Sequence, residues 1–367
     1  MEDNFIKINK WLYPVAWLYG TGVWLRNKLF DWGVYKERRF NLPVISVGNI
    51  TVGGTGKTPH TEYLIRLLQK TYKVAVLSRG YKRKSKGFVL ARQDTPVSMI
   101  GDEPFQMKQK FPDIYMTVDR DRCHGIEQLC DEHIAPGTEV VILDDAFQHR
   151  YVKPGMNILL VDYHRLICED ALLPAGRMRE PESGKSRAHI VIVTKCPKDI
   201  TPMELRVLSK QMGLYPYQQL YFTTLKYGEL YPLSPAGEKK RSLDTMEKGE
   251  HVLLLTGIAS PDKLIKDLSP YNIAIDSLTF SDHHDFTAKD MELIKKRFMK
   301  LPQGKRLIIT TEKDAVRLAA HPLLDEALIP YIYVLPVEVA FLQDQQESFN
   351  SNITDYVRKN SRNSSFS

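Results

Sequence analysis

The chain has 367 residues, of which 43% are hydrophobic and 26% are charged, the composition of an ordinary soluble globular protein. Its length predicts two domains of about 150 residues each. The formal net charge of +7 favours an anionic partner, such as nucleic acid, acidic lipid or a phosphorylated substrate. The four cysteines include no CxxC pair, which argues against a disulfide framework and against a zinc site.

Residues 5–30 combine helical periodicity with aromatic side chains. Apolar residues recur there at helical spacing, and Trp11, Trp17 and Trp24 add the aromatic character of a membrane interface. The run ends at Arg26 and is too short to cross about 30 Å of hydrocarbon. The pattern fits an amphipathic helix in a membrane interface, and it fits a helix packed on the protein's own core equally well.

The segment from Pro43 to Thr61 organises the chain. A β-branched apolar run enters a glycine-rich turn, and a helical stretch follows to Leu68, which is the strand–loop–helix context of a P-loop. The glycines allow positive φ, so the amides of the turn and the positive end of the helix can face an anion. The residues predicted to bind ATP are Thr51, Val52, Gly53, Gly54, Thr55, Gly56, Lys57 and Thr58.

Two side chains of this loop carry specific chemistry. Lys57 is predicted to reach the β- and γ-phosphates, and the Thr58 hydroxyl is predicted to ligate Mg²⁺. The usual first glycine of the motif is replaced by Thr51. The alternative is a purely structural turn, but Gly-Lys-Thr after a strand is more specific than a lone glycine pattern.

A basic loop follows the next strand, which is predicted over Lys73–Leu77. The residues 78–86 carry five cations in a short space. They form either a solvated loop or a clamp on a phosphate or lipid headgroup, because open α/β sheets bind ligands beyond the carboxyl ends of their strands. Further on, Gly101-Asp102-Glu103-Pro104 precedes an amphipathic helix, for which Asp102 or Glu103 can serve as the N-cap.

A second acidic motif follows a buried strand. The apolar run Val140–Leu143 ends in Asp144 and Asp145, which is the form of a Walker B element that delivers a carboxylate to the Mg²⁺ of a P-loop. Two more buried strands are predicted over Asn157–Val161 and His189–Thr194, with a basic loop between them.

Strands alternate with helices, which predicts right-handed βαβ units. The expected fold is α/β and P-loop kinase-like, with a largely parallel sheet flanked by helices, a second smaller α/β domain and an N-terminal amphipathic helix. The predicted parts are a membrane-interface helix (1–35), a kinase core (36–215), a linker hairpin (216–235), a smaller α/β domain (236–349) and a flexible tail (350–367).

Seven segments together resemble the tetraacyldisaccharide 4'-kinase family, the lipid A disaccharide kinases of Gram-negative bacteria. They are VISVGNITVGGTGKT, LSRGYKRKSKG, GDEP, LDDAFQHR, LLPAGRMREP, FSDHHDF and TTEKDAVRL. The P-loop is generic, whereas LDDxFQHR together with LPAGxxREP and GDEP is specific to this family. The replacement of the first glycine by Thr51 is also typical of it.

The resemblance implies ATP- and Mg²⁺-dependent phosphorylation of the 4'-hydroxyl of a tetraacylated glucosamine disaccharide, the lipid A precursor, to form lipid IVA. It also implies peripheral attachment to the cytoplasmic face of the bacterial inner membrane, which favours a membrane-interface role for residues 5–30. We expect a monomer that binds no nucleic acid.

The resemblance also assigns roles to single residues. Asp102 corresponds to the catalytic aspartate and His283 to its histidine partner, with the neighbouring His284 as a competing assignment; a carboxylate in reach of a sugar hydroxyl can accept its proton. Thr58, Asp144 and Asp145 are the implied metal ligands. The implied substrate-binding residues are Arg79, Arg120, Arg122, Gln148, His149, Arg179 and Glu180.

The motifs alone leave other classes open. A membrane-associated ATPase of the deviant Walker type would carry its additional lysine where this chain has Val52. A P-loop kinase for another soluble or lipid-linked sugar would share the same motifs but would not explain the aromatic N-terminus if its substrate were soluble. A nucleic-acid-binding module would use the basic charge, but no nucleic-acid-binding motif is present.

Overall fold

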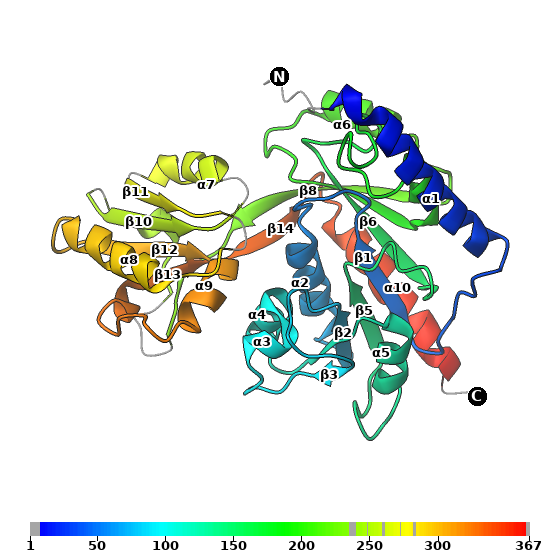
Figure 1. The fold of residues 1–367 in the computed structure, drawn as a ribbon, viewed down its shortest axis with the longest axis horizontal. Coiled ribbons are helices and arrows are strands. Elements are labelled where there is room, and N and C mark those ends of the chain that lie inside the picture. The colour runs from blue at the N-terminus through cyan, green and yellow to red at the C-terminus, as the bar shows by residue number, and fades with distance from the viewer. Residues whose placement is uncertain are drawn as a thin grey trace. The chain divides into compact units, whose positions relative to one another are not determined.

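The computed structural model describes residues 8–234, 240–247, 249–258, 261–271, 273–281 and 284–364. The chain folds into two compact units. The first unit comprises Met1–Leu225 and Val339–Ser367, and the second comprises Lys226–Glu338. Each unit is an α/β structure built on its own sheet (Figure 1), so the predicted fold class is confirmed.

The first unit holds most of the regular structure. Its strands are β1 (Val44–Gly48), β2 (Val74–Ser78), β3 (Val89–Leu90), β4 (Tyr115–Val118), β5 (Val140–Asp144), β6 (Met156–Asp162), β7 (Ile190–Thr194), β8 (Gln219–Tyr227) and β14 (Val337–Phe341), of which the last two extend across the boundary between the units. Its helices are α1 (Tyr13–Asp31), α2 (Lys57–Leu68), α3 (Val97–Ile100), α4 (Asp102–Lys110), α5 (Arg122–Leu129), α6 (Pro202–Met212) and α10 (Gln346–Ser364), with 3-10 turns at Lys10–Leu12 and Glu182–Arg187.

The nine-stranded sheet has the order β14-β8-β7-β6-β1-β5-β2-β4-β3. The pairings among β1, β2, β4, β5, β6, β7 and β8 are all parallel, whereas β3 pairs antiparallel with β4. Strand β1 lies between β5 and β6, and the register places Val47 beside Asp144. The carboxyl ends of these strands therefore meet at one edge of the sheet, where ligands bind in open α/β folds.

Both faces of this sheet are covered by helices. Side chains of α2, α4 and α10 pack with one face of the sheet in a single buried cluster. Helices α5 and α6 cover the other face through two further clusters. Strand β1 is buried along its whole length, because a parallel strand with helices on both faces has no solvated side.

The second unit contains a five-stranded sheet of order β11-β10-β12-β13-β9. Its strands are β9 (Tyr231–Pro232), β10 (His251–Thr256), β11 (Ala274–Thr279), β12 (Arg306–Thr311) and β13 (Ile332–Leu335); its helices are α7 (Pro261–Leu268), α8 (Ala288–Lys300) and α9 (Glu312–Ala319), with 3-10 turns at Leu243–Thr245, Ser269–Tyr271 and Ile329–Tyr331. Helix α7 packs on one face and helices α8 and α9 pack on the other.

Two local expectations are corrected. The predicted hairpin over 216–235 does not form, because β8 pairs with β7 in the large sheet while β9 pairs antiparallel with β13 in the small one. The tail from residue 350 is helical in α10 as far as Ser364. Phe349, Ile353 and Val357 are spaced four residues apart and are buried in the core of the first unit. This apolar stripe overrides the polar composition of the segment.

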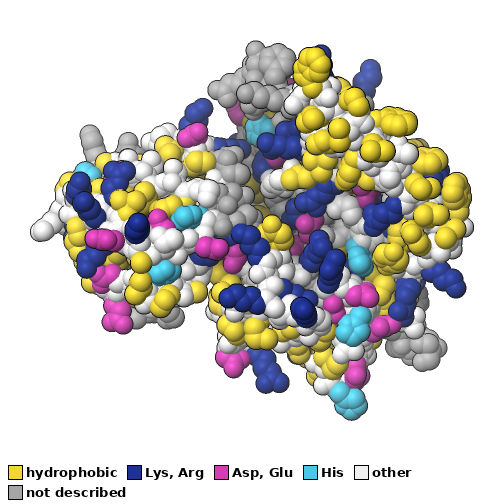
Figure 2. Space-filling view, in the orientation of Figure 1, with side chains coloured by type: hydrophobic (Ala, Val, Ile, Leu, Met, Phe, Trp, Pro, Cys, Tyr) yellow, Lys and Arg dark blue, Asp and Glu magenta, His cyan; other side chains and the backbone are white. Residues whose placement is uncertain are grey.

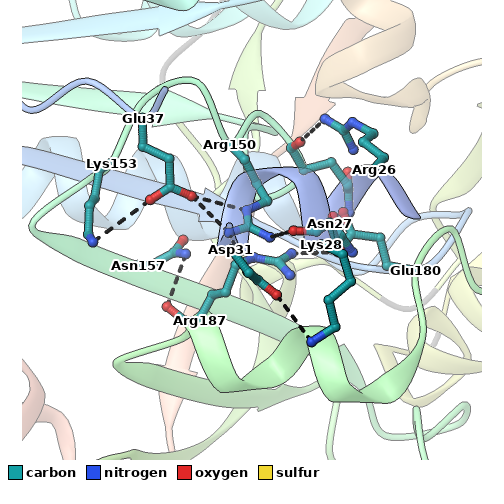
Figure 3. A network of polar contacts seen from close by, with 11 residues as sticks. Arg26, Asn27, Lys28, Asp31, Glu37, Arg150, Lys153, Asn157, Glu180 and Arg187 are labelled. Atoms are coloured by element: carbon teal, nitrogen blue, oxygen red, sulfur yellow. Dashed lines mark hydrogen bonds and ion pairs between the residues drawn. The ribbon is translucent and has the colours of Figure 1, made fainter. Parts of the chain in front are cut away.

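Helix α1 belongs to the first unit, and side-chain contacts near its C-terminal end hold it against the rest of that unit (Figure 3). The Arg150 guanidinium donates to the Asn27 carbonyl at 3.0 Å and to the carboxylates of Asp31 and Glu37, each at 2.9 Å. Arg150 also lies over the Phe30 ring at 4.9 Å. None of the helices in the described part of the chain has the length and the apolar character that a membrane crossing requires.

Candidate functional site

The glycine-rich turn between β1 and α2 has the backbone geometry of an anion-binding loop. Gly53 and Gly56 adopt positive φ, at 117° and 83°, which only glycine takes without strain. Gly56 is the N-cap of α2 and no side chain caps this helix start. The first amides of α2 are therefore left for another acceptor, and the positive end of the helix dipole favours an anion there.

Lys57 and Asp145 lie together at this helix start. The Lys57 Nζ is 3.7 Å from Asp145 Oδ1, and the Arg179 Nη1 is 3.8 Å from Asp145 Oδ2. The Asp145 Oδ1 atom is buried and has no hydrogen-bond partner in the described structure. A buried carboxylate oxygen without a donor, beside a loop that contributes the Thr58 hydroxyl, fits the oxygen donor set that Mg²⁺ prefers.

The adjacent Asp144 is engaged differently. It is fully buried, and its two carboxylate oxygens accept hydrogen bonds from Thr61 Oγ1 at 3.2 Å and Ser78 Oγ at 3.1 Å. Burial raises the pKa of Asp144, the charge of Asp145 raises it further, and Lys57 acts in the opposite direction. Asp145 has a positive φ of 46°, so the two successive carboxylates face different partners.

A group of basic and polar residues lies beside this carboxylate pair. Arg122 is buried and donates to the carbonyls of Asp119 at 2.7 Å and Asp144 at 3.4 Å. Burial lowers the pKa of Arg122 to about 10. Burial also lowers the pKa of His149 to about 4, and the charges of Arg122 and Arg79 act in the same direction. The structure thus places Arg122 beside the acidic pair, with Arg79 and His149 close enough to Arg122 for their charges to interact.

The segment 177–179 braces the loop from its N-terminal side. The Val52 amide donates to the Arg177 carbonyl and the Arg179 amide to the Ile50 carbonyl, both at 2.7 Å. The Gln148 side-chain amide donates to the Asn49 carbonyl, and the Gln148 backbone carbonyl accepts from the Arg26 guanidinium at 2.8 Å. Gln148 and Arg179, both predicted to bind substrate, therefore also hold the loop in place.

The backbone carbonyls of three consecutive loop residues accept hydrogen bonds from side chains. Lys195 Nζ donates to the Gly54 carbonyl, Thr194 Oγ1 donates to the Thr55 carbonyl at 2.9 Å, and His60 Nδ1 contacts the Gly56 carbonyl at 2.7 Å. Lys195 also pairs with Asp162 at 2.7 Å. We call His60, Thr194 and Lys195 the carbonyl anchors.

Asp102 is the first residue of α4, and the N-cap of this helix is Gly101. Gly101 packs so closely on the basic loop that an added Cβ would lie 2.7 Å from the Tyr81 carbonyl oxygen. Asp102 thus sits where α4 meets the loop that carries Arg79. His283 lies outside the described residues. His284 Nε2 is bound to Asp290 Oδ2 at 2.9 Å and stacks on Phe280 in the second unit.

The remaining predicted residues occupy different settings. Arg120 is exposed. Glu180 is fully buried and pairs with Arg187 at 2.5 Å, which is the environment of a structural ion pair. Sequence reasoning missed the carbonyl anchors and the hydroxyls of Thr61 and Ser78. The only local signal was the position of His60, four residues after Gly56, whereas the others come from separate strands.

The family model described as "Tetraacyldisaccharide-1-P 4'-kinase" matches residues 8–358. A relative from Phocaeicola vulgatus named "Tetraacyldisaccharide 4'-kinase" is 85% identical, and the alignment covers all of both chains. A relative of the same name from Bacteroides fragilis is 58% identical and is aligned over all of this chain and 97% of its own length.

A solved structure is also similar. The crystal structure of LpxK from Aquifex aeolicus in complex with ATP superimposes with a TM-score of 0.73 at 28% identity, over 95% of this chain and 99% of that one. The family model and both relatives extend over nearly the whole chain, including both units. The chain therefore belongs to the tetraacyldisaccharide 4'-kinase family.

Proposed function

We propose that this protein is an ATP-dependent kinase that phosphorylates the 4'-hydroxyl of a tetraacylated glucosamine disaccharide 1-phosphate, the precursor of lipid A, to form lipid IVA. The observation that carries the proposal is the uncapped start of α2, where Lys57 lies 3.7 Å from Asp145, in a chain that belongs to this family. ATP is the expected donor, because the similar LpxK structure was solved in complex with ATP.

The residues of the first unit divide the chemistry. The amides at the start of α2 and the Lys57 ammonium bind the phosphates of ATP, with Thr51–Thr58 forming the loop. Thr58 and Asp145 would hold Mg²⁺, which neutralises charge on the β- and γ-phosphates when bound. The hydroxyls of Ser78 and Thr61 hold the neighbouring Asp144 carboxylate in place.

The transfer itself needs one proton acceptor. The 4'-hydroxyl oxygen forms a bond to the γ-phosphorus while the bond from that phosphorus to the β,γ-bridging oxygen breaks, and ADP leaves. The hydroxyl proton passes to the Asp102 carboxylate. The resemblance assigns His283 to orient this carboxylate, with His284 as the competing choice. Arg79 and Arg179 supply positive charge for the phosphorylated substrate.

A transfer assay tests the function directly. Purified protein with Mg·ATP is offered the tetraacyl disaccharide 1-phosphate, soluble sugars and nucleosides in parallel. Phosphate incorporation at the 4'-position of the lipid alone is the expected result. Transfer to a soluble sugar instead would favour another P-loop kinase, and ATP hydrolysis without transfer to any acceptor would favour an ATPase. Asp102→Ala should lose most of kcat while still binding ATP, and near-normal turnover would exclude Asp102 as the base.

We also propose that α1 attaches the protein to the cytoplasmic face of the inner membrane. The helix buries the small residues Ala16 and Gly20 against the protein and exposes large apolar ones, a gathering of hydrophobic side chains that Figure 2 shows where α1 runs in Figure 1. The exposed fraction is 74% for Trp17 and 69% for Leu18 in α1, and 93% for Trp11 in the 3-10 turn that precedes it. Burying several such side chains in an interface contributes about 1.5–3 kcal/mol each.

Liposome flotation tests this attachment. Trp11→Glu, Trp17→Glu and Leu18→Glu together should release the protein from vesicles while leaving the contacts of Arg26 and Arg150 intact. Unchanged flotation would remove α1 from membrane binding. We further propose that the protein is a monomer that binds no nucleic acid, and light scattering after size exclusion and a filter-binding assay check these two points.

A further inference from the structure

His60 links the phosphate loop to strand β8 through two buried contacts. Its ring Nδ1 lies 2.7 Å from the Gly56 carbonyl oxygen, and its Nε2 lies 3.1 Å from Thr223 Oγ1. His60 is 4% exposed and Thr223 is fully buried. Water therefore has little access to this path, and each polar atom relies on its partner in the protein.

The two contacts fix the proton positions on the ring. A carbonyl oxygen can only accept a hydrogen bond, so Nδ1 must carry the proton. The Nε2 atom of a neutral ring is then an acceptor, and the Thr223 hydroxyl donates to it. Hydrogen bonds thus run in one direction from Thr223 through His60 to Gly56.

The Gly56 carbonyl belongs to the same peptide as the Lys57 amide. In a trans peptide the C=O and N–H bonds point in opposite directions. Binding the carbonyl on the His60 side turns the Lys57 amide to the other side. Gly56 has a φ of 83° and is the N-cap of α2, and the glycine-specific turn that precedes this peptide has no side-chain cap to hold it.

We propose that His60 is a positioning residue for the kinase reaction, which orients the Gly56–Lys57 peptide so that the Lys57 amide faces the nucleotide phosphates. The proposal rests on the proposed function of the loop as the ATP site. Thr194 and Lys195 hold the two preceding carbonyls. His60 holds the peptide that contains the Lys57 amide, through its ring Nδ1 at 2.7 Å and through its backbone amide at 3.3 Å, and the substitutions below remove the ring contact alone. Because His60 is buried, we assign its effect to this peptide and not to a direct contact with the nucleotide.

Substitutions at position 60 separate positioning from folding. His60→Asn places an amide N–H near the position of Nδ1, whereas His60→Gln places one near the position of Nε2. We expect His60→Leu to raise the KM for ATP and the Kd of Mg·ATP about tenfold, the value of one hydrogen bond, with the KM for the lipid acceptor unchanged. His60→Asn should recover most of this loss, and His60→Gln should not.

Binding of Mg·ATP is measured by calorimetry without acceptor, so it tests His60 even if the acceptor proves to be a different sugar. Folded His60→Leu with Mg·ATP affinity within twofold of wild type would overturn the proposal. If His60→Leu does not fold, the affinities of His60→Asn and His60→Gln for Mg·ATP are compared instead. Binding by His60→Gln as tight as that by His60→Asn would overturn the proposal. Ring ¹⁵N shifts of His60 provide an independent check: a protonated Nδ1 is expected, and a protonated Nε2 would contradict the assignment.

Discussion

Two helix starts in this protein follow a parallel strand and yet are built in opposite ways. At the start of α2, side chains bind backbone carbonyls, namely those of Gly54, Thr55 and Gly56. At the start of α9, side chains bind backbone amides. Thr311 Oγ1 accepts from the Asp314 amide at 3.2 Å, and Asp314 Oδ2 accepts from the Gly257 amide at 2.8 Å.

The difference shows which helix start is free for a ligand. Where side chains bind the loop carbonyls, as at α2, the amides at the helix start remain available to bind an anion. Where a side-chain hydroxyl already caps a first-turn amide, as Thr311 Oγ1 does for the Asp314 amide in α9, fewer amides remain for a phosphate. Thr311 therefore acts as the N-cap of α9, although the order of strand and helix there matches that at α2.

The largest expected effect is the loss of activity on removing the cation at α2. Lys57→Ala should lower kcat/KM at least about 100-fold, because the ammonium stabilises charge that develops on the transferred phosphate. The matched control is Lys289→Ala near the start of α8, which a capping box of Thr287 and Asp290 already closes. Kinase assays on both variants are compared with their circular dichroism. A Lys57→Ala enzyme with control-like activity would end the distinction between the two kinds of helix start.

Replacement of Asp314 should mainly lower stability, whereas replacement of Asp145 should mainly lower kinase activity. Asp314→Ala leaves the buried Gly257 amide without its acceptor and should lower the free energy of unfolding by about 3 kcal/mol. Asp145→Ala should change it by less than about 1 kcal/mol, because that carboxylate is 33% exposed and its cations lie 3.7 Å and 3.8 Å away, yet it should abolish transfer. Urea titrations and kinase assays of both variants measure the two effects. An equal loss of stability in Asp314→Ala and Asp145→Ala would contradict the prediction.

The dependence of stability on pH tests the same comparison, because a neutral imidazole binds the Gly56 carbonyl at α2, whereas a threonine hydroxyl caps α9. Burial lowers the pKa of folded His60 to about 4 from 6.5. Between these values the unfolded chain binds a proton that the folded chain does not. The stability present above pH 6.5 is therefore lost as the pH falls, at a rate of up to about 1.4 kcal/mol per pH unit.

Urea titrations at pH 7, 6 and 5 compare wild type with His60→Leu, which lacks this group in both states. The wild type should lose more stability than the variant as the pH falls. His124 provides an internal contrast of opposite sign, because the hydrogen bond to Asp119 raises its pKa and its contribution is lost as the pH rises. Parallel pH slopes for wild type and His60→Leu would exclude a buried neutral imidazole at position 60.

The smallest expected effect is the loss of a single helix cap. Thr311→Ala removes the hydroxyl that accepts from the Asp314 amide and should lower the free energy of unfolding by about 1 kcal/mol. The kcat of the folded enzyme should stay within twofold of wild type, because this cap supports the protein and not the nucleotide. A large loss of kcat with normal stability would instead place Thr311 in the nucleotide site.

Local pattern alone identified the parts of the site that are continuous in the chain. The strand, the glycine turn and Lys57 follow one another, so their spacing predicted a P-loop, and the apolar run before Asp144 predicted a buried strand that ends in carboxylates. These predictions succeed because a strand and the turn after it are determined largely by neighbouring residues. The predicted strand at Lys73–Leu77, for example, corresponds to β2.

Only the tertiary structure decided which distant groups meet there. The pairing of β5 with β1 and β2 brings Ser78 and Asp144 to one edge of the sheet, and the strand order that causes this is not written in any local pattern. The same pairing places Asp145 beside Lys57 and Asp144 at the hydroxyls of Ser78 and Thr61. The carbonyl anchors from β7 and the burial of α10 also depend on contacts between segments far apart in the chain, because register and packing are properties of the folded sheet.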